Sequence, residues 1–225
     1  MSDNKSLVVV SAGASDPSST AMLSGRAADR VREIGARRGV EFRTTGIEIR
    51  ALAHDIADAL VTQSVSDGLQ VALDAVRDAD GLIVSTPVYK AGPSGLLTAF
   101  FQVLDNDVLI GTPTILAATA GTRRHALVVD EQLRGLFAYM RAMTVPTALF
   151  AAPEDWGSGL NERLDRAATE LIALVETGFR SAVRDANWSS YQHSYGSAGG
   201  TELGIDLNTD LMRLATGGTD QVGQN

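Results

Sequence analysis

The sequence has no cysteine, few histidines and fewer basic than acidic residues. Because Cys is 0, disulfide bonds, thiolate metal sites and cysteine nucleophiles are excluded. The three histidines, His54, His125 and His193, are far apart in the chain and lack the spacing of metal ligands, so we expect no metal site. Lys and Arg number 19 against 27 Asp and Glu, and the resulting net charge of −8 repels nucleic acid and anionic membranes.

Targeting signals are missing as well. The first ten residues contain no basic stretch leading into a long apolar region, and no apolar run approaches the length of a membrane span. We therefore expect a cytoplasmic protein that does not contact a membrane. Its 225 residues, of which 44% are hydrophobic and 20% charged, suffice for one domain with a full core.

Strand-like and helix-like segments alternate along the chain. Short apolar runs predict strands at residues 7–10, 40–49, 81–85, 114–118 and 145–150. Apolar residues repeating every three or four positions predict helices between the strands, including one continuous helix from about Arg124 to Met143. Residues 52–61 are ambiguous, and we expect a loop with a helical turn there. The alternation predicts an α/β fold with a five-stranded parallel sheet wound by helices on both faces.

The end of the chain differs in composition from the rest. Residues 185–225 are rich in Gly, Ser, Thr and Asn. We therefore divide the chain into a domain of residues 1–184 and a C-terminal extension of residues 185–225. Leu211, Met212 and Leu214 are apolar enough to dock on the domain or on a partner subunit, which favours a partly ordered extension over a disordered tail.

The most informative segment is residues 79–101, ADGLIVSTPVYKAGPSGLLTAFF. Ile83 and Val84 lie at the centre of a strand expected to be buried on both faces. Because proline fixes φ and restricts the residue before it, we expect residues 86–89 to leave the sheet. A loop rich in proline, tyrosine and glycine at the end of a buried strand suits a flat ring packed against backbone.

Three loops are expected to meet at the carboxyl edge of the sheet, where open α/β sheets bind their ligands. The first, residues 11–20, has five hydroxyl side chains in ten residues and precedes a helix, which favours a phosphate over a plain serine cap. The second and third, residues 86–95 and 119–122, offer backbone groups to a planar heterocycle, although Gly121 alone would suggest only a turn. The first loop matches neither the P-loop pattern nor the Gly-x-Gly-x-x-Gly pattern of dinucleotide sites.

Residues 79–101, followed by TPTILAATAGTRRHALVVDEQLRGLFAYM, resemble the NAD(P)H-dependent FMN reductases of flavodoxin-like fold. The likeness is greatest to reductases that supply reduced flavin to two-component monooxygenases, and it covers residues 5–152. It implies FMN and NADPH or NADH as cofactors, a flavin-dependent monooxygenase as the acceptor of reduced flavin, and a homodimer or homotetramer.

The resemblance also implies which residues contact FMN. Those for the phosphate are Ser11, Ser18, Ser19 and Thr20; those lining the isoalloxazine are Pro87, Val88, Tyr89 and Lys90; and those closing its other side are Thr119, Ala120, Gly121 and Thr122. Many members have an arginine shortly after the first strand, in a Gly-Ser-x-Arg pattern. Gly13, within Ser-Ala-Gly-Ala, stands in that place here. Phosphate binding is therefore expected to depend on hydroxyl and backbone groups alone.

Hydride transfer to a flavin requires no acid, base or nucleophile from the protein. In agreement with this, the sequence has no Gly-x-Ser-x-Gly elbow, and the acidic pair Glu154 and Asp155 falls at a predicted element end, where we expect capping or solvation. Two alternatives stay open: a retained FMN that reduces quinones, azo dyes or metal oxyanions, and a non-enzymatic flavodoxin-type electron carrier. Arg123 and Arg124 are candidates for the 2′-phosphate of NADPH, or a solvated pair at a helix start.

Overall fold

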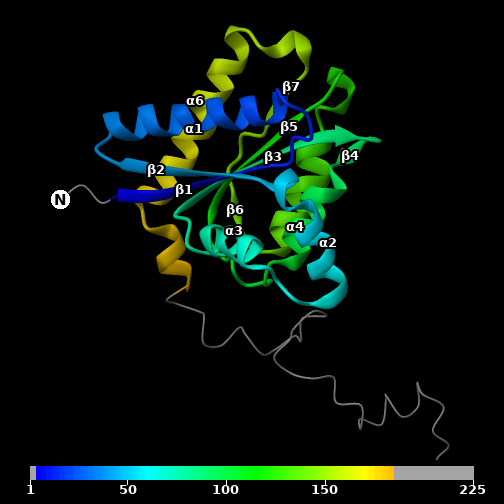
Figure 1. Ribbon diagram of the computed structural model, residues 1–225. Coiled ribbons are helices and arrows are strands. Elements are labelled where there is room, and N and C mark those ends of the chain that lie inside the picture. The colour runs from blue at the N-terminus through cyan, green and yellow to red at the C-terminus, as the bar shows by residue number, and fades with distance from the viewer. Residues whose placement is uncertain (1–3, 185–225) are drawn as a thin grey trace, which may run out of the picture. The chain divides into compact units, whose positions relative to one another are not determined.

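The computed structural model describes residues 4–184, so the predicted C-terminal extension lies outside the described residues. A parallel sheet runs through this part of the chain, with helices on either side (Figure 1). The strands are β1 (Asn4–Ser11), β2 (Glu41–Glu48), β3 (Gly81–Tyr89), β4 (Gly92–Pro93), β5 (Pro113–Thr119), β6 (Met143–Thr144) and β7 (Leu149–Ala151). The order β2-β1-β3-β5-β6 is that of flavodoxin-like folds and confirms the predicted fold class.

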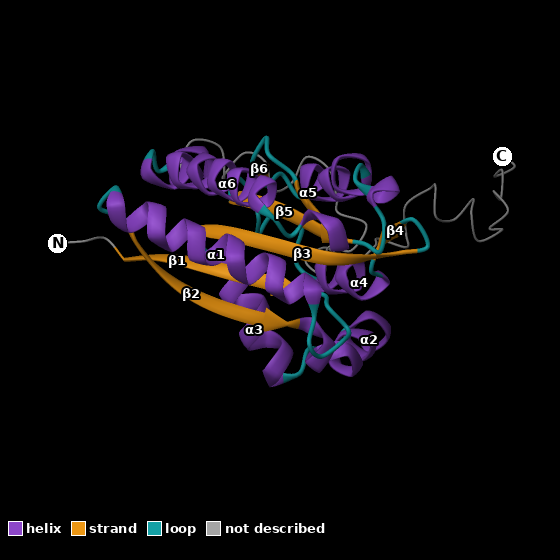
Figure 2. Ribbon diagram, turned by 90° about the horizontal axis from the view of Figure 1, so that it is seen from above, coloured by secondary structure: helices purple, strands orange, loops and turns teal. Residues whose placement is uncertain are grey.

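The helices form one layer on each face of the sheet (Figure 2). On one face lie α1 (Ser19–Arg37) and α6 (Ser158–Glu176), and on the other lie α2 (Ala53–Thr62), α3 (Asp67–Arg77), α4 (Gly95–Val103) and α5 (Arg134–Tyr139). Along β1, Leu7 and Val9 pack with the first layer, whereas Val8 and Val10 pack with the second. Both faces of this central strand are buried, which explains why it is apolar without alternation.

The third strand corrects one prediction. Residues 86–89 do not leave the sheet, because β3 continues to Tyr89 and Pro87 pairs in register with Thr119 of β5. The Ser85 carbonyl accepts the Ala12 N–H at 2.9 Å on the β1 side of the strand. Pro87, two residues further on, faces the same side after the pairing with β1 has ended. A residue without an N–H is tolerated there.

The segment that follows Pro87 forms a short hairpin. Val88 and Tyr89 pair antiparallel with Pro93 and Gly92 of β4. The two residues of its turn, Lys90 and Ala91, have φ values of 51° and 64°. Such turns normally carry Asn-Gly, because Gly and Asn adopt positive φ more readily than Lys or Ala.

The ambiguous segment 52–61 is helical, so the prediction of a loop is wrong. A 3-10 turn, η1 (Ile49–Leu52), leads directly into α2. This helix buries only Ile56 and Ala59 and has no side-chain cap at its start. The usual sequence signals of a helix are therefore weak here. By contrast, Ser66 caps α3, since its Oγ accepts the Leu69 N–H at 3.2 Å.

The continuous helix predicted from about Arg124 to Met143 is also wrong. A 3-10 turn, η2 (Arg123–His125), and a π-helical turn, η3 (Val129–Leu133), precede the short helix α5. The apolar stripe is nevertheless real, because Val129, Leu133 and Phe137 are all buried. The periodicity of apolar residues predicted which side chains face the core, but it did not predict where the helix is interrupted.

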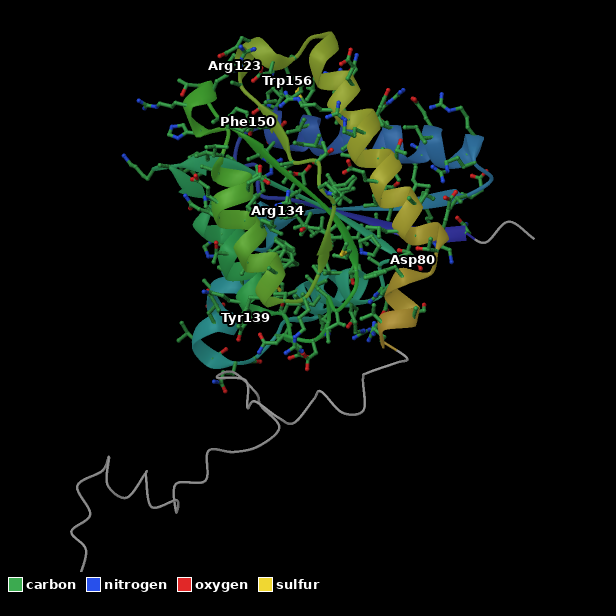
Figure 3. The ribbon with its side chains drawn as sticks, turned by 180° about the vertical axis from the view of Figure 1, so that it is seen from behind. Asp80, Arg123, Arg134, Tyr139, Phe150 and Trp156 are labelled. Carbon is green, nitrogen blue, oxygen red and sulfur yellow. The ribbon has the colours of Figure 1, made fainter. Side chains whose placement is uncertain are left out.

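The fifth predicted strand is interrupted. Only its end, residues 149–150, lies in a strand, β7, whereas β6 comes before residue 145; the two pair with different parts of β5. The Arg134 guanidinium lies beside the interruption (Figure 3) and donates to Thr144 Oγ1 at 2.9 Å, the Val145 carbonyl at 3.0 Å and the Pro146 carbonyl at 3.2 Å. These bonds satisfy backbone carbonyls that the sheet leaves unpaired.

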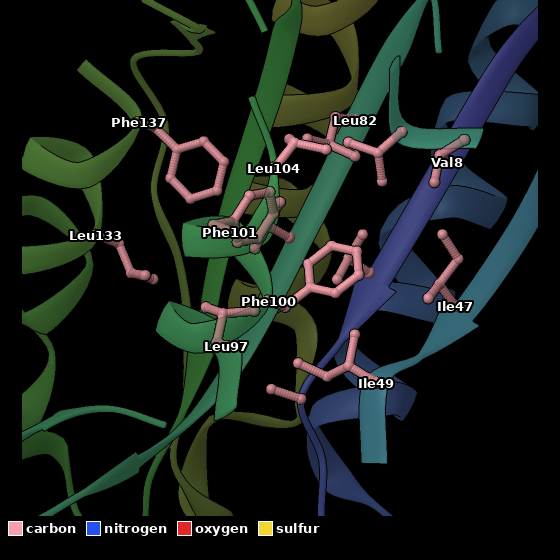
Figure 4. Close-up of a cluster of buried hydrophobic side chains, with 14 of the residues drawn as sticks. Val8, Ile47, Ile49, Leu82, Leu97, Phe100, Phe101, Leu104, Leu133 and Phe137 are labelled. Atoms are coloured by element: carbon pink, nitrogen blue, oxygen red, sulfur yellow. The ribbon is translucent and has the colours of Figure 1, made fainter. Parts of the chain in front are cut away.

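Phenylalanine rings join α4 and α5 beneath the sheet (Figure 4). The Phe100 and Phe101 ring centroids lie 5.3 Å apart and those of Phe101 and Phe137 4.8 Å apart, both in edge-to-face geometry. Phe100 and Phe137 are fully buried. This packing fixes the helix that follows the β3–β4 hairpin, and with it the edge of the sheet where the predicted loops lie.

Candidate functional site

The three predicted loops converge at the carboxyl edge of β1, β3 and β5, which are neighbours in the sheet. Thr20, at the start of α1, and Thr119, at the end of β5, bring their hydroxyl oxygens to 2.7 Å although they are 99 residues apart in the sequence. Both residues are buried. The first loop and the loop after β5 are therefore in direct contact.

The first loop forms a tight cradle in front of α1. The Ser18 Oγ accepts the Ala21 N–H at 3.2 Å and so begins the helix. A Cβ on Gly13 would lie 1.9 Å from this oxygen, so a larger residue there would displace the Ser18 hydroxyl. Ser19 is exposed next to the free N–H groups of the first helical turn. Backbone donors, a hydroxyl and close backbone approach are the chemistry that a phosphate monoester requires.

Ser11 lies deeper than the rest of the first loop. Its Oγ accepts the Gly13 N–H at a long 3.5 Å, and the residue is buried. It lines a hollow of about 280 Å³ between α1 and β2. Of the four predicted phosphate hydroxyls, those of Ser11, Ser18 and Thr20 already have protein partners, whereas Ser19 is exposed.

The β3–β4 hairpin carries the second group of predicted residues. Pro87 is buried, Val88 is partly buried, and Tyr89 and Lys90 are exposed. The Gln132 amide donates to the Ala91 carbonyl at 2.8 Å and ties the turn to η3. Because 53% of Tyr89 is exposed, its ring is free to stack on a ligand and does not support the loop from below.

The third loop continues directly from β5. The Ala120 N–H donates to the Ala151 carbonyl at 3.2 Å, which holds the loop against β7. A Cβ on Gly121 would meet nothing within 4 Å. Protein neighbours therefore do not require glycine at this position, and the backbone between Ala120 and Thr122 is open to close approach by a ring.

Asp155 also helps to shape this edge of the sheet, and the sequence suggested only a cap or a solvated carboxylate there. Its carboxylate accepts the Ala152 N–H at 2.9 Å and pairs with the Arg123 guanidinium at 2.6 Å. The Ala152 N–H, followed by Arg123, holds the pKa of Asp155 below its ordinary value of 3.8. The bridge joins the loop after β5 to the loop after β7.

The neighbouring arginines Arg123 and Arg124 have different surroundings. Arg123 contacts Asp155 and also lies 3.6 Å from Glu154, and the hydrogen bond that it donates to Asp155 raises the pKa of its guanidinium. The Arg124 Nε lies 3.4 Å from His125 Nε2. Among residues 4–184, no three His, Asp or Glu side chains gather closely enough to hold a metal ion.

A sheet of order β2-β1-β3-β5-β6, with the Gly13 loop after β1 and the loops after β3 and β5 at the same edge, defines a flavodoxin-like protein. The sequence pattern of the NADPH-dependent FMN reductase family matches residues 6–157, and the chain belongs to this family.

Individual relatives agree with this assignment. The chain is 38% identical over 150 residues to FMN reductase (NADPH) of Pseudomonas aeruginosa, covering 67% of this chain and 78% of that protein. It is 36% identical over 192 residues to NADH-dependent FMN reductase SfnF of Pseudomonas fluorescens, covering 83% and 100%. The crystal structure of an oxidoreductase from Corynebacterium diphtheriae superposes with a TM-score of 0.76 at 43% identity, covering 78% of this chain and 99% of that one.

The protein is therefore an NAD(P)H-dependent FMN reductase, with FMN and NAD(P)H as its substrates. The resemblance found in the sequence is confirmed at the level of family and reaction. No helix within residues 4–184 is long and apolar enough to cross a membrane.

Proposed function

We propose that FMN binds at the three loops, is reduced there, and leaves as reduced FMN for a partner flavin-dependent monooxygenase. The residues proposed to bind it are Ser11, Ser18, Ser19 and Thr20 at the phosphate, Pro87, Val88, Tyr89 and Lys90 along the ring, and Thr119, Ala120, Gly121 and Thr122 on its other side. The observation that carries the proposal is the hydrogen bond between Thr20 and Thr119, which brings the first and third loops together beside the cradle at Gly13.

Bound FMN supplies the hydride acceptor, and the protein has to hold and orient the reactants. The helix N-terminus and Ser19 bind the phosphate by donating hydrogen bonds. The exposed Tyr89 ring and the open backbone at Gly121 leave two surfaces against which planar groups pack. Stacking at a fixed distance is sufficient for direct hydride transfer, so no acid or base from the protein is required.

Release of the flavin, as opposed to retention, is supported by the charge of the first loop. Asp16 is the charged residue of the stretch 11–20, and this loop has no arginine of its own. Asp16 repels a dianionic phosphate, and the neutral donors of the loop do not offset this repulsion as an arginine in the loop would. Weak binding suits a flavin that must be exchanged at every turnover.

The test is NAD(P)H oxidation by the purified protein with and without added FMN. Oxidation that rises with free FMN in saturating fashion, and that drives a flavin-dependent monooxygenase in a coupled assay, is the expected outcome. A protein that stays yellow through gel filtration and reduces quinones without responding to added FMN would favour the retained cofactor. Flavin binding without NAD(P)H oxidation would favour an electron carrier.

We further propose that Arg124, not Arg123, meets the 2′-phosphate when NADPH is used. Arg123 is already paired with Asp155 and Glu154. Replacing Arg124 by Gln should raise KM for NADPH about fivefold or more while leaving KM for NADH within twofold, in keeping with the loss of one charge-assisted hydrogen bond. The matched Arg123→Gln variant should change both values alike. Equal changes in the Arg124→Gln variant would refute this assignment.

A homodimer or homotetramer in the cytoplasm completes the proposal. Exposed apolar side chains on and between α2 and α3, namely Leu60, Val61, Val65 and Val71, support an interface between subunits. A cytoplasmic location agrees with the consumption of NAD(P)H. Light scattering during gel filtration and fractionation of cells test these two points, and a monomer at micromolar concentration would contradict the first.

A further inference from the structure

We propose that Arg50 supplies the positive charge for the FMN phosphate that the first loop lacks, and that Asp16 competes with the phosphate for this arginine. The inference rests on the proposed FMN site and names a binding residue outside all three predicted loops. Arg50 belongs to η1, directly after β2.

The fold brings Arg50 to the first loop through the pairing of two strand ends. Glu48, the last residue of β2, pairs in register with Ser11, where the first loop begins. The Arg50 Nε donates to Glu48 Oε2 at 3.0 Å, and its NH2 group lies 3.7 Å from Asp16 Oδ2 within the loop. Figure 4 shows the neighbouring Ile49 beside the chain that continues from β1. One guanidinium therefore spans the end of β2 and the loop.

The charges in this cluster do not favour a phosphate unless Arg50 takes part in its binding. Asp16 and Glu48 contribute two negative charges against the one positive charge of Arg50. A phosphate monoester adds about −1.5 to −2 at neutral pH. Without a direct contact to the guanidinium, the phosphate would meet net repulsion on this side of the loop.

The contact between Arg50 and Asp16 is weak enough to be exchanged. The distance of 3.7 Å exceeds that of a hydrogen bond, and 82% of the Asp16 side chain is exposed. A phosphate offers a guanidinium two parallel hydrogen bonds, which an exposed carboxylate at this distance does not. Glu48 holds the guanidinium by its Nε, and the NH2 group is left facing the loop. Arg50 is also 36% exposed, so a ligand can reach it.

The proposal predicts opposite effects for two substitutions on the binding of FMN. Arg50→Gln should raise Kd for FMN about tenfold, and Asp16→Asn should lower it about threefold, because one removes the attractive charge and the other its competitor. Riboflavin has the same ring without the phosphate, so its Kd should change less than twofold in either variant. All values come from titrations followed by flavin fluorescence.

Arg43→Gln is the matched control. Arg43 is an exposed arginine on β2, paired in register with Ser6 and about 17 Å along the strand from Glu48, the residue that holds Arg50. The Arg43→Gln substitution changes the net charge by the same amount as Arg50→Gln and should leave the Kd values for FMN and for riboflavin unchanged. A rise in Kd for FMN as large in Arg43→Gln as in Arg50→Gln would reduce the effect to net charge and overturn the proposal.

Two other outcomes separate failure of this inference from failure of the proposed FMN site. If the wild-type protein binds FMN and Arg50→Gln weakens FMN and riboflavin equally, Arg50 acts on the ring or the fold, and the inference is wrong. If Gly13→Ala leaves FMN binding intact, the phosphate lies elsewhere, and the proposed site fails with it. Raising the salt concentration should weaken FMN binding in the wild type more than in Arg50→Gln.

Discussion

Gly13 lies where any side chain would collide with the serine that begins α1. Substitution by Ala would push the Ser18 Oγ away from the Ala21 N–H and close the cradle in front of the helix. We expect a loss of about 1 kcal/mol in the free energy of unfolding, typical of a lost N-cap, and at least a tenfold weaker affinity for FMN. Urea denaturation and flavin titration measure the two effects.

Gly25→Ala in the same helix is the control for Gly13→Ala. A Cβ there meets nothing within 4 Å, so the change removes only the flexibility of glycine. We expect it to stabilise the protein by about 0.5–1 kcal/mol and to leave FMN affinity unchanged. Equal losses of FMN binding in both variants would show that the cradle has no special role.

The Asp155 carboxylate makes a pH-dependent contribution to stability. Its pKa is lowered by the Ala152 N–H and by Arg123, so the charged form favours the folded state. This stabilisation is complete above the ordinary pKa of 3.8 and is lost as the pH falls through the lower folded value. Asp155→Asn should therefore cost on the order of 1 kcal/mol at pH 7, and the difference from wild type should shrink below about pH 4.

Unfolding by urea at pH 7, 5 and 3.5 measures this dependence. Glu154→Gln is the control, because that side chain lies 3.6 Å from Arg123 and is half exposed, so its removal should cost little. A loss in Asp155→Asn that is the same at all three pH values would show that the side chain acts by shape and not by charge.

Hydroxyl side chains show what sequence reasoning misses at the scale of single residues. The count of hydroxyls in residues 11–20 pointed to a phosphate loop, and the cradle at Gly13 fits such a loop. Three of these hydroxyls, however, have protein partners, at Gly13, Ala21 and Thr119. The contact between Thr20 and Thr119 joins residues far apart in the chain, so no local pattern could predict it.

At the scale of elements, the β3–β4 hairpin carries backbone strain in its turn. Ala91 has a φ of 64°, a conformation that costs a residue with a Cβ on the order of 1 kcal/mol. Replacing it by Gly should raise the free energy of unfolding by about 0.5–1 kcal/mol. Gly39→Ala, at φ 82° with open space around the Cβ, should lower it by a similar amount. Thermal unfolding of both variants checks the pair, and a destabilised Ala91→Gly would contradict the strain argument.

Elements built from local periodicity could be predicted from the sequence, and those that depend on distant contacts could not. The helix α6 and the strand β5 follow the apolar spacing read from the chain. The π-helical turn and the interrupted fifth strand instead involve Gln132 bonded to Ala91 and Arg134 bonded to the carbonyls around Pro146. A polar side chain does not reveal such a partner by its spacing.

At the scale of the molecule, the carboxyl edge of the sheet carries the proposed flavin site and the amino edge anchors the end of the described chain. Asp80 accepts the Ser6 N–H at 2.8 Å at that amino edge. Arg180, after α6, donates to the carbonyls of Arg77 and Ala79 at the end of α3. Burial lowers the pKa of its guanidinium, which remains charged at neutral pH. The proposed ligand site and the hydrogen bonds that hold the last described residues thus lie at opposite edges of the sheet.

This separation predicts how truncation should act. A chain ended after Arg184 keeps both hydrophobic cores and the Arg180 bonds, so it should fold and bind FMN with a Kd within twofold of the full chain.

A chain ended after Thr177 loses those bonds and the contact of Arg180 with Gly111, where a Cβ would come within 3.3 Å of the Arg180 Cα. We expect a loss of about 2–3 kcal/mol in the free energy of unfolding, because hydrogen bonds to a charged group are strong. Arg180→Ala in the full chain should reproduce most of this loss. If ending the chain after Arg184 abolished FMN binding, residues 185–225 would be part of the site, and a single domain of residues 1–184 would be the wrong description.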